Sequence, residues 1–246
     1  MQVLIVYAHP EPQSFNGAMK DLAVATLTAQ GHGVEVSDLY AMGWNPVAGP
    51  DDFTGPRAKT ASFSLAREQT VAVETGTLAA DIAAEQAKLT RADLVIFQFP
   101  LWWFGMPAIL KGWADRVFAR GFAYLPGRKY DTGMFHGKTA MVVATTGTSE
   151  DTYAPDGIDG DILSVLWPIH NGLLRYTGFD VLHPYMAYMP ARLDAEGRAT
   201  QLAGYKARLQ SLSETPRLFF HPATDYGPDE RLKPGVQARS GVQRNV

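Results

Sequence analysis

The sequence has no cysteine among its 246 residues, which excludes disulfide frameworks, thiol nucleophiles and cysteine-based zinc or iron–sulfur sites. It also lacks an excess of positive charge, because 22 Lys and Arg residues against 25 Asp and Glu residues give a net charge of −3. This balance argues against nucleic acid or an anionic membrane as a partner. The six histidines are never four residues apart, which argues against a metal hydrolase.

Targeting and membrane segments are not expected either. The first residues carry no basic stretch or cleavage site, which predicts a cytoplasmic protein. The most apolar stretch, Leu94 to Leu110, contains Gln98, Pro100 and Pro107, so it fits a strand, a loop and a helix better than membrane insertion. With 46% apolar residues and 11% aromatics, the chain can bury the core of one large domain or two small ones.

Short apolar runs alternate with segments of helical period along the chain. Strands are predicted at 3–8, 34–36, 94–99 and 139–146 and within 179–188. Helices are predicted from Phe15 to about residue 31 with Ser14 as cap, around 78–89, from Pro107 as first helical residue, irregularly over 161–175, and after Asp194. Residues 43–77 have no sustained period and are expected to be mostly irregular.

This alternation predicts an α/β fold with a flavodoxin-like, doubly wound parallel sheet of strand order 2-1-3-4-5 and helices on both faces. Residues 1–215 are expected to form that domain. Residues 216–246 are polar and punctuated by prolines, which indicates a C-terminal extension. Ligands of such sheets bind outside the carboxyl ends of the strands, so the loops that follow the strands are the candidate site.

Three loops qualify. The first, His9 to Asn16, opens a helix whose free N–H groups suit a phosphate, although a plain capped turn has the same pattern. It has neither a GxGxxG string nor a Walker lysine, which argues against an ordinary dinucleotide site or a P-loop. The second, Pro100 to Pro107, carries three adjacent aromatics that suit a flat ring such as isoalloxazine, or core and dimer packing. The third, Thr145 to Asp161, has glycines and hydroxyls that suit the edge of a ligand, or a flexible loop.

Longer strings around these loops carry a resemblance. They are Ala8-His9, Ser14-Phe15-Asn16, Ala18-Met19-Lys20, Ser37-Asp38-Leu39-Tyr40-Ala41-Met42, Phe97-Gln98-Phe99-Pro100-Leu101, Trp103-Phe104-Gly105, Pro107-Ala108-Ile109-Leu110-Lys111-Gly112-Trp113, Thr145-Thr146-Gly147, Leu166-Trp167-Pro168-Ile169 and Gly178-Phe179. Together they resemble the NAD(P)H:quinone oxidoreductase family, the DT-diaphorase-like flavoenzymes. The resemblance runs from residue 2 to about residue 220 and leaves out the tail.

The resemblance implies non-covalent FAD rather than FMN, a homodimer with each active site at the subunit interface, and ping-pong, two-electron reduction of quinones by NAD(P)H. The cofactor residues that it implies are His9, Ser14, Phe15, Asn16, Ala18, Pro100, Leu101, Trp103, Phe104, Asp115, Thr145, Thr146, Gly147, Tyr153 and Arg198. The substrate pocket that it implies is lined by Trp103, Phe104, Tyr124 and Tyr176. It does not settle the choice between NADH and NADPH.

Three positions depart from the family. The family's catalytic pair is a Tyr and a His, and here Tyr153 is present while Asp159 stands at the His position. An ionised Asp159 would oppose the negative charge that a reduced flavin carries. Thr148 replaces a family glycine, and Leu125-Pro126 replaces a stretch with a second pocket tyrosine.

Two other classes stay open beside the quinone reductase. A flavodoxin-type electron carrier is disfavoured, because such carriers are smaller and strongly acidic. A regulatory flavoprotein subunit that binds a protein partner shares the same features, and a nitro- or azo-reductase is a close neighbour among enzymes.

Overall fold

Six parallel strands form one sheet at the centre of the computed structural model, which describes residues 1–239 and 242–245. They are β1 (Gln2–Tyr7), β2 (Gly33–Asp38), β3 (Leu94–Pro100), β4 (Thr139–Thr146), β5 (Asp180–Val181) and β6 (Tyr185–Tyr188). Their order, β2-β1-β3-β4-β5 with β6 also on β4, confirms the predicted flavodoxin-like fold. Strand β3 is buried along its whole length, as its unbroken apolar run predicts.

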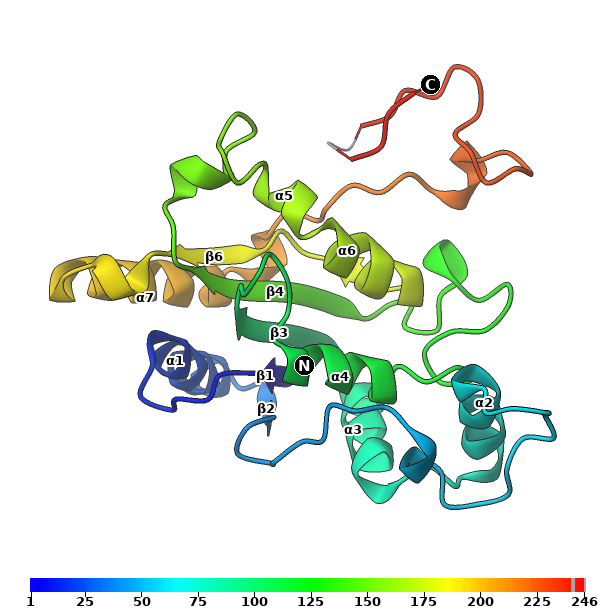
Figure 1. The fold of residues 1–246 in the computed structure, drawn as a ribbon. Helices are drawn as coiled ribbons and strands as arrows, with labels where there is room; N and C mark the ends of the chain where they lie inside the picture. The colour runs from blue at the N-terminus through cyan, green and yellow to red at the C-terminus, as the bar shows by residue number, and fades with distance from the viewer. Residues whose placement is uncertain (240–241, 246) are drawn as a thin grey trace.

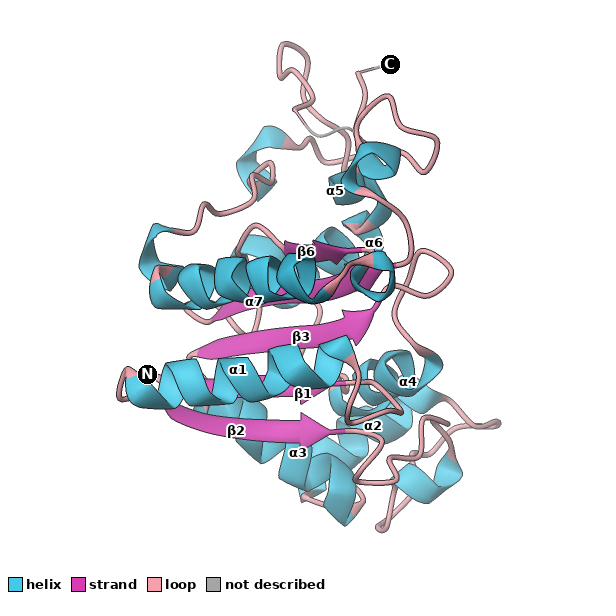
Figure 2. Cartoon of the chain, turned by 90° about the vertical axis from the view of Figure 1, so that its left-hand side faces the viewer, coloured by secondary structure: helices cyan, strands magenta, loops and turns pink. Residues whose placement is uncertain are grey.

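Helices cover both faces of this sheet. Helices α1 (Phe15–Ala29) and α7 (Ala195–Gln210) lie side by side on one face, as Figure 2 shows in front of the strands. Helices α3 (Ala80–Arg91) and α4 (Ala108–Val117) lie on the other face (Figure 1). Each face has its own apolar core, and Trp113 of α4 packs edge-on against Phe97 of β3 at 5.9 Å between ring centroids. The two layers hold the carboxyl ends of the strands rigidly.

The predicted irregular helix at 161–175 is confirmed. It consists of α5 (Ile162–Val165), α6 (Trp167–Ile169) and a π-helical segment, η4 (His170–Arg175). The break falls beside Pro168, which lacks the N–H group needed to continue the helical hydrogen bonds.

The last strand position is split between β5 and β6. Pro184 lies in the gap and has no N–H to donate to β4. In the same gap the His183 N–H donates to the Pro216 carbonyl at 2.8 Å, and the Leu218 N–H donates to the Val181 carbonyl at 2.8 Å. The start of the extension is therefore hydrogen-bonded along the edge of β5. The division of the chain after residue 215 stays a prediction.

The prediction that residues 43–77 are mostly irregular is incomplete, and the prediction that Pro107 is a first helical residue is wrong. Residues 43–77 include helix α2 (Leu65–Thr75), which escapes the apolar period because its buried positions are Glu68, Gln69 and Ala72. Helix α4 begins at Ala108, and Pro107 is its extended cap with ψ of 146°.

Short 3₁₀ turns complete the chain, namely η1 (Pro50–Asp52), η2 (Tyr130–Thr132), η3 (Glu150–Tyr153), η5 (Pro190–Arg192), η6 (Leu212–Glu214) and η7 (Ala223–Asp225). Within residues 1–239 and 242–245, no helix is long and apolar enough to cross a membrane.

Candidate active site

A cavity of about 760 Å³ opens at the carboxyl ends of β1, β3 and β4, and we call it the strand-end cavity. Most of the residues expected to bind a cofactor line it. The lining consists of His9, Ser14, Phe15, Asn16, Pro100, Leu101, Trp102, Trp103, Thr145, Thr146, Gly147, Pro190, Ala191 and Arg198. The three loops that the sequence singles out therefore meet at one place.

The first loop is held in position by polar contacts that reach across the cavity. The Asn16 side chain donates to Thr145 Oγ1 at 2.7 Å, and the Asn16 carbonyl accepts from Gln98 Nε2 at 2.6 Å. Gln98 is fully buried in β3. Asn16 Oδ1 is buried and has no hydrogen-bond partner among residues 1–239 and 242–245. The loop thus has a fixed geometry and one unused acceptor.

Gly17 allows this loop to pack against the first turn of α1. Its N–H donates to Ser14 Oγ at 3.1 Å, which is the predicted helix cap. A Cβ atom at position 17 would lie 1.9 Å from the Pro12 carbonyl oxygen, far inside any van der Waals contact. Only glycine fits there without movement of the loop.

We therefore expect Gly17→Ala to weaken binding of the flavin that the resemblance implies by about tenfold or more, because each lost loop contact to a charged group costs roughly 1.5–3 kcal/mol. Alanine has the higher helix propensity by up to about 1 kcal/mol, but the contact with the Pro12 carbonyl forces the loop to move, so the loop and not the helix should change. Flavin titration by fluorescence quenching measures the change. Gly204→Ala in α7, where the nearest atom is the Tyr185 hydroxyl, is the matched control. Unchanged affinity in Gly17→Ala would contradict this role.

The second loop is a strained aromatic turn. Trp103 and Phe104 have φ of 50° and 58°, in the left-handed region, and Trp102 and Gly105 exchange backbone hydrogen bonds at 3.2 and 3.0 Å. Such two-residue turns favour Asn-Gly, and large side chains in them cost energy. Trp103 is 97% exposed as a result. Backbone strain of this kind concentrates at functional sites.

The third loop brings together two of the three departures from the family, Thr148 and Asp159. Thr148 Oγ1 donates to Asp159 Oδ2 at 3.1 Å, and Thr152 Oγ1 donates to Thr148 Oγ1 at 3.0 Å. The Asp159 N–H also donates to the Thr152 carbonyl at 2.8 Å. Asp159 is therefore tied back into its own loop by the residue that replaces the glycine.

Tyr153 lies behind the aromatic turn. It is buried, and its ring packs against those of Phe104 and Tyr188 at centroid distances of 6.3 and 6.2 Å. Burial raises the pKa of Tyr188 to about 12, so this neighbour of Tyr153 stays a neutral phenol.

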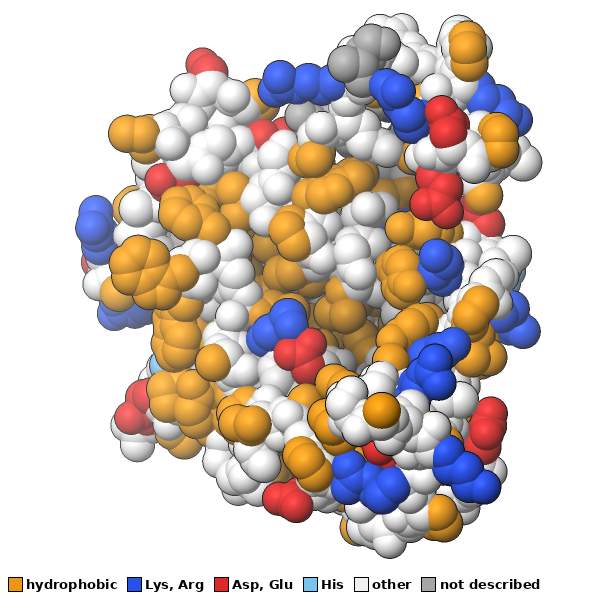
Figure 3. Space-filling model, turned by 45° about the vertical axis from the view of Figure 1, so that its right-hand side comes forward, with side chains coloured by type: hydrophobic (Ala, Val, Ile, Leu, Met, Phe, Trp, Pro, Cys, Tyr) orange, Lys and Arg blue, Asp and Glu red, His pale blue; other side chains and the backbone are white. Residues whose placement is uncertain are grey.

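A second cavity of about 690 Å³, the aromatic cleft, lies on the other side of this turn. Figure 3 shows a hollow in which hydrophobic side chains gather. The cleft is lined by Leu65, Ala66, Gln69, Phe104, Gly105, Met106, Lys111, Ala114, Asp115, Phe118, Tyr124, Val165, Pro168, Ile169, Gly172, Leu173, Tyr176 and Thr177. Tyr124 and Tyr176 are in contact, with ring centroids 5.8 Å apart, and burial raises the pKa of Tyr176. The cleft therefore offers flat apolar walls with neutral phenol groups.

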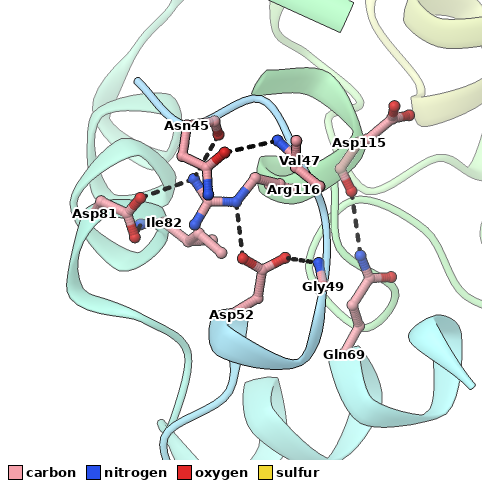
Figure 4. A network of polar contacts seen from close by, with 9 residues as sticks. All are labelled: Asn45, Val47, Gly49, Asp52, Gln69, Asp81, Ile82, Asp115 and Arg116. Carbon is pink, nitrogen blue, oxygen red and sulfur yellow. Dashed lines mark hydrogen bonds and ion pairs between the residues drawn. The ribbon is translucent and has the colours of Figure 1, made fainter. Parts of the chain in front are cut away.

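A buried arginine of α4 joins three other segments of the chain. Arg116 donates to Asp52 at 2.8 Å, to Asp81 at 2.8 Å and to the Asn45 carbonyl at 3.0 Å (Figure 4). The neighbouring Asp115 carbonyl accepts from Gln69 Nε2 of α2 at 3.3 Å. These bonds fasten the segment after β2 and helix α2 to α4.

Some expected cofactor residues do not line the strand-end cavity. Ala18 is exposed on α1, and Asp115 lies in the aromatic cleft, paired with Lys111 at 2.6 Å. Phe104 lines the cleft, and the buried Tyr153 is in the lining of neither cavity. The sequence analysis did not identify Trp102, which lines the cavity beside His9. It also did not identify Gln98, although Gln98 is the one polar residue in the apolar run 94–99.

Comparison with known proteins identifies the family. A family model described as a flavodoxin-like fold matches residues 1–212. NAD(P)H dehydrogenase (quinone) 1 of Rattus norvegicus is 46% identical over 242 residues, which cover 98% of this chain and 88% of the rat protein. The chain belongs to the NAD(P)H:quinone oxidoreductase family. Ribosyldihydronicotinamide dehydrogenase (quinone) of Homo sapiens, 47% identical over 212 residues, covers 86% of this chain and 91% of the human protein.

A member of known structure has nearly the same fold. The Klebsiella pneumoniae protein named "Putative quinone reductase" is 44% identical, has a TM-score of 0.93, and matches over 98% of both chains. The rat alignment and this superposition both reach into the extension, so the likeness to the family goes beyond the predicted limit near residue 220.

Proposed function

We propose that this chain is a flavin-dependent NAD(P)H:quinone oxidoreductase that reduces quinones by two electrons through bound FAD. The observation that carries the proposal is the meeting of two cavities at one turn, because Trp103 lines the strand-end cavity and Phe104 lines the aromatic cleft. One cavity suits a cofactor with phosphate and a flat ring, and the other suits a flat substrate. The names of the rat and human relatives both specify a quinone, and the name of the rat protein specifies NAD(P)H as the donor.

The residues present fit a flavin nucleotide. The volume of the strand-end cavity lies within the range of small-molecule sites, about 300–1,000 Å³. Asn16 Oδ1 is an unused acceptor, and a Cβ at Gly147 would meet nothing within 4 Å, so the backbone there is open to a ring edge. The lining continues to Ala191 and Arg198, which favours the longer FAD over FMN.

Each wall has a separate task in this proposal. The N–H groups of the loop from His9 to Asn16 hold the pyrophosphate, and the aromatic turn supports the isoalloxazine ring. A bound flavin supplies reversible hydride transfer. Tyr153 would be the hydroxyl donor to the pyrimidine edge of such a flavin and would stabilise negative charge there. The aromatic cleft excludes water and orients NAD(P)H and then the quinone in the same slot, so we expect ping-pong kinetics.

We also propose a homodimer with the active site at its interface and a location in the cytoplasm. Trp103 is 97% exposed and Ile158 is 93% exposed, and both lie on loops at the carboxyl edge of the sheet. Trp102 and Phe104, the neighbours of Trp103 in the turn, are exposed as well, and a group of exposed large apolar side chains marks an interaction surface. A second copy that covers Trp103 would also close the site from water.

The deciding experiment is purification of the full chain, release of its cofactor by denaturation, and stopped-flow mixing with NADH, NADPH and a naphthoquinone. We expect a yellow protein that releases FAD, is reduced by a nicotinamide and is reoxidised by the quinone. A colourless protein that takes up neither FAD nor FMN would refute the proposal. Reduction without quinone turnover would favour a partner-binding subunit, and faster turnover of nitro or azo compounds would favour that class of reductase.

The charge of Asp159 should slow this reaction. A carboxylate within about 8 Å of developing negative charge costs about 1–2 kcal/mol at an effective dielectric constant near 20. We therefore expect Asp159→Asn to speed flavin reduction about fivefold to tenfold, and Asp159→His to speed it at least as much near neutral pH. Asp156→Asn on the same exposed loop is the matched control. Equal rates of flavin reduction in the wild-type protein and in the Asp159→Asn, Asp159→His and Asp156→Asn variants would mean that Asp159 takes no part in the reaction.

A further inference from the structure

A third hollow lies beside the aromatic cleft, and we call it the basic hollow. It has a volume of about 370 Å³ and is lined by Ala58, Lys59, Thr60, Arg67, Thr70, Val71 and Arg120. Three of its residues, Lys59, Arg67 and Arg120, are cationic. They come from three separate parts of the chain: the loop before α2, the first turn of α2, and the segment after α4.

The positive charge of this hollow is not neutralised by the protein. Among residues 1–239 and 242–245, none of the three cations has a carboxylate within ion-pair distance. The nearest acid on α2, Glu68, is buried and already paired with Arg57 at 3.2 Å and with the Ala58 N–H at 3.0 Å. Like charges held around one space repel each other, so an anion bound there would be stabilised by all three.

The basic hollow and the aromatic cleft lie on two sides of helix α2. Leu65, Ala66 and Gln69 of α2 line the cleft, while Arg67, Thr70 and Val71 line the hollow. The two spaces therefore lie on opposite faces of α2, and a helix with its side chains is about 10–12 Å wide.

Arg120 lies at the border between them. Its N–H donates to Gln69 Oε1 at 3.1 Å, and its backbone forms a bridge with Tyr124, which lines the cleft. Blue side chains gather beside the hydrophobic hollow in Figure 3.

We infer that the basic hollow binds the 2′-phosphate of NADPH while the nicotinamide lies in the aromatic cleft, which makes NADPH the preferred hydride donor over NADH. This inference rests on the proposed function. A phosphate monoester carries close to two negative charges near neutral pH, and arginine guanidinium groups bind its oxygens in pairs. NADH has a hydroxyl in place of this phosphate and gains nothing from the three cations. Arginine near a nucleotide ribose is the general way in which proteins select the 2′-phosphate.

The test compares kcat/KM for NADPH and NADH in the full-length holoenzyme with a naphthoquinone acceptor. We expect the wild-type protein to prefer NADPH, and Arg120→Gln and Arg67→Gln each to lower kcat/KM for NADPH about tenfold or more through loss of a charge-assisted bond. The value for NADH should not change. The matched control is Arg91→Gln, because Arg91 is an exposed arginine at the end of α3 that pairs with Glu35 of β2.

The outcomes separate this inference from the proposed function. An equal loss for both nucleotides, or no loss for either, would overturn the phosphate assignment while leaving the reductase intact. A wild-type protein that is reduced by neither nucleotide would refute the proposed function itself. Competition distinguishes the source of the phosphate: adenosine 2′-monophosphate should inhibit NADPH oxidation more strongly than adenosine 5′-monophosphate. Equal inhibition by inorganic phosphate alone would identify a simple anion site and contradict a nucleotide site.

Discussion

Tyr153→Phe should slow flavin reduction by NAD(P)H about 100-fold to 1,000-fold, the usual effect of removing one hydrogen-bond donor at developing negative charge. The substitution removes a single oxygen. The ring, buried between Phe104 and Tyr188, keeps its packing, so the fold and the flavin content should stay the same. Stopped-flow absorbance under anaerobic conditions measures the rate of reduction directly.

A control variant and a control measurement test whether the effect comes from the Tyr153 hydroxyl. Tyr40→Phe, an exposed tyrosine in the turn after β2, should reduce flavin at the wild-type rate. Flavin affinity measured on the Tyr153→Phe protein should be unchanged, because the hydroxyl acts on the charge that builds up during the reaction and not on the resting cofactor. A wild-type rate in Tyr153→Phe would mean that another group stabilises that charge.

Arg116→Leu should have the largest effect on stability. It leaves Asp52, which is 3% exposed, as a buried carboxylate without its cation. Breaking a buried ion pair by removing one partner costs about 3–5 kcal/mol. It also removes the guanidinium that lies 4.6 Å from the Trp44 ring centroid. We expect a free energy of unfolding lower by this amount in urea titrations.

The control is Arg91→Leu, which breaks an exposed pair with Glu35 and should cost less than about 1 kcal/mol. Asp52→Asn combined with Arg116→Leu should recover part of the loss, because no buried unpaired charge then remains; the other partner of Arg116, Asp81, is exposed to solvent. A cost below 1 kcal/mol for Arg116→Leu alone would show that Asp52 finds water or another partner.

The layout of the sheet was predictable because the physics behind it is local. Continuous apolar runs such as 94–99 are buried on both faces of a parallel sheet, and the cap at Ser14 fixes the start of α1. The meeting of the three loops followed from the same layout, since the carboxyl ends of parallel strands lie on one edge.

Other features depend on contacts between distant residues. Helix α2 turns Glu68 and Gln69 inward, and these are acceptable in a core only because Arg57 and the backbone at Asp115 and Arg120 supply partners. The sequence of α2 itself does not indicate these partners. The bond between Thr148 and Asp159 is of the same kind, because each residue alone looks like an unrelated departure from the family.

The hydrogen bonds that the extension makes with β5 have a consequence for solubility. A strand at the edge of a sheet presents unpaired N–H and C=O groups to which a strand of another molecule can add, and this is a common beginning of aggregation. Here the Val181 carbonyl and the His183 N–H are already bonded to Leu218 and Pro216 of the same chain. Together with the proline between β5 and β6, the first residues of the extension therefore protect this edge against unwanted pairing between molecules.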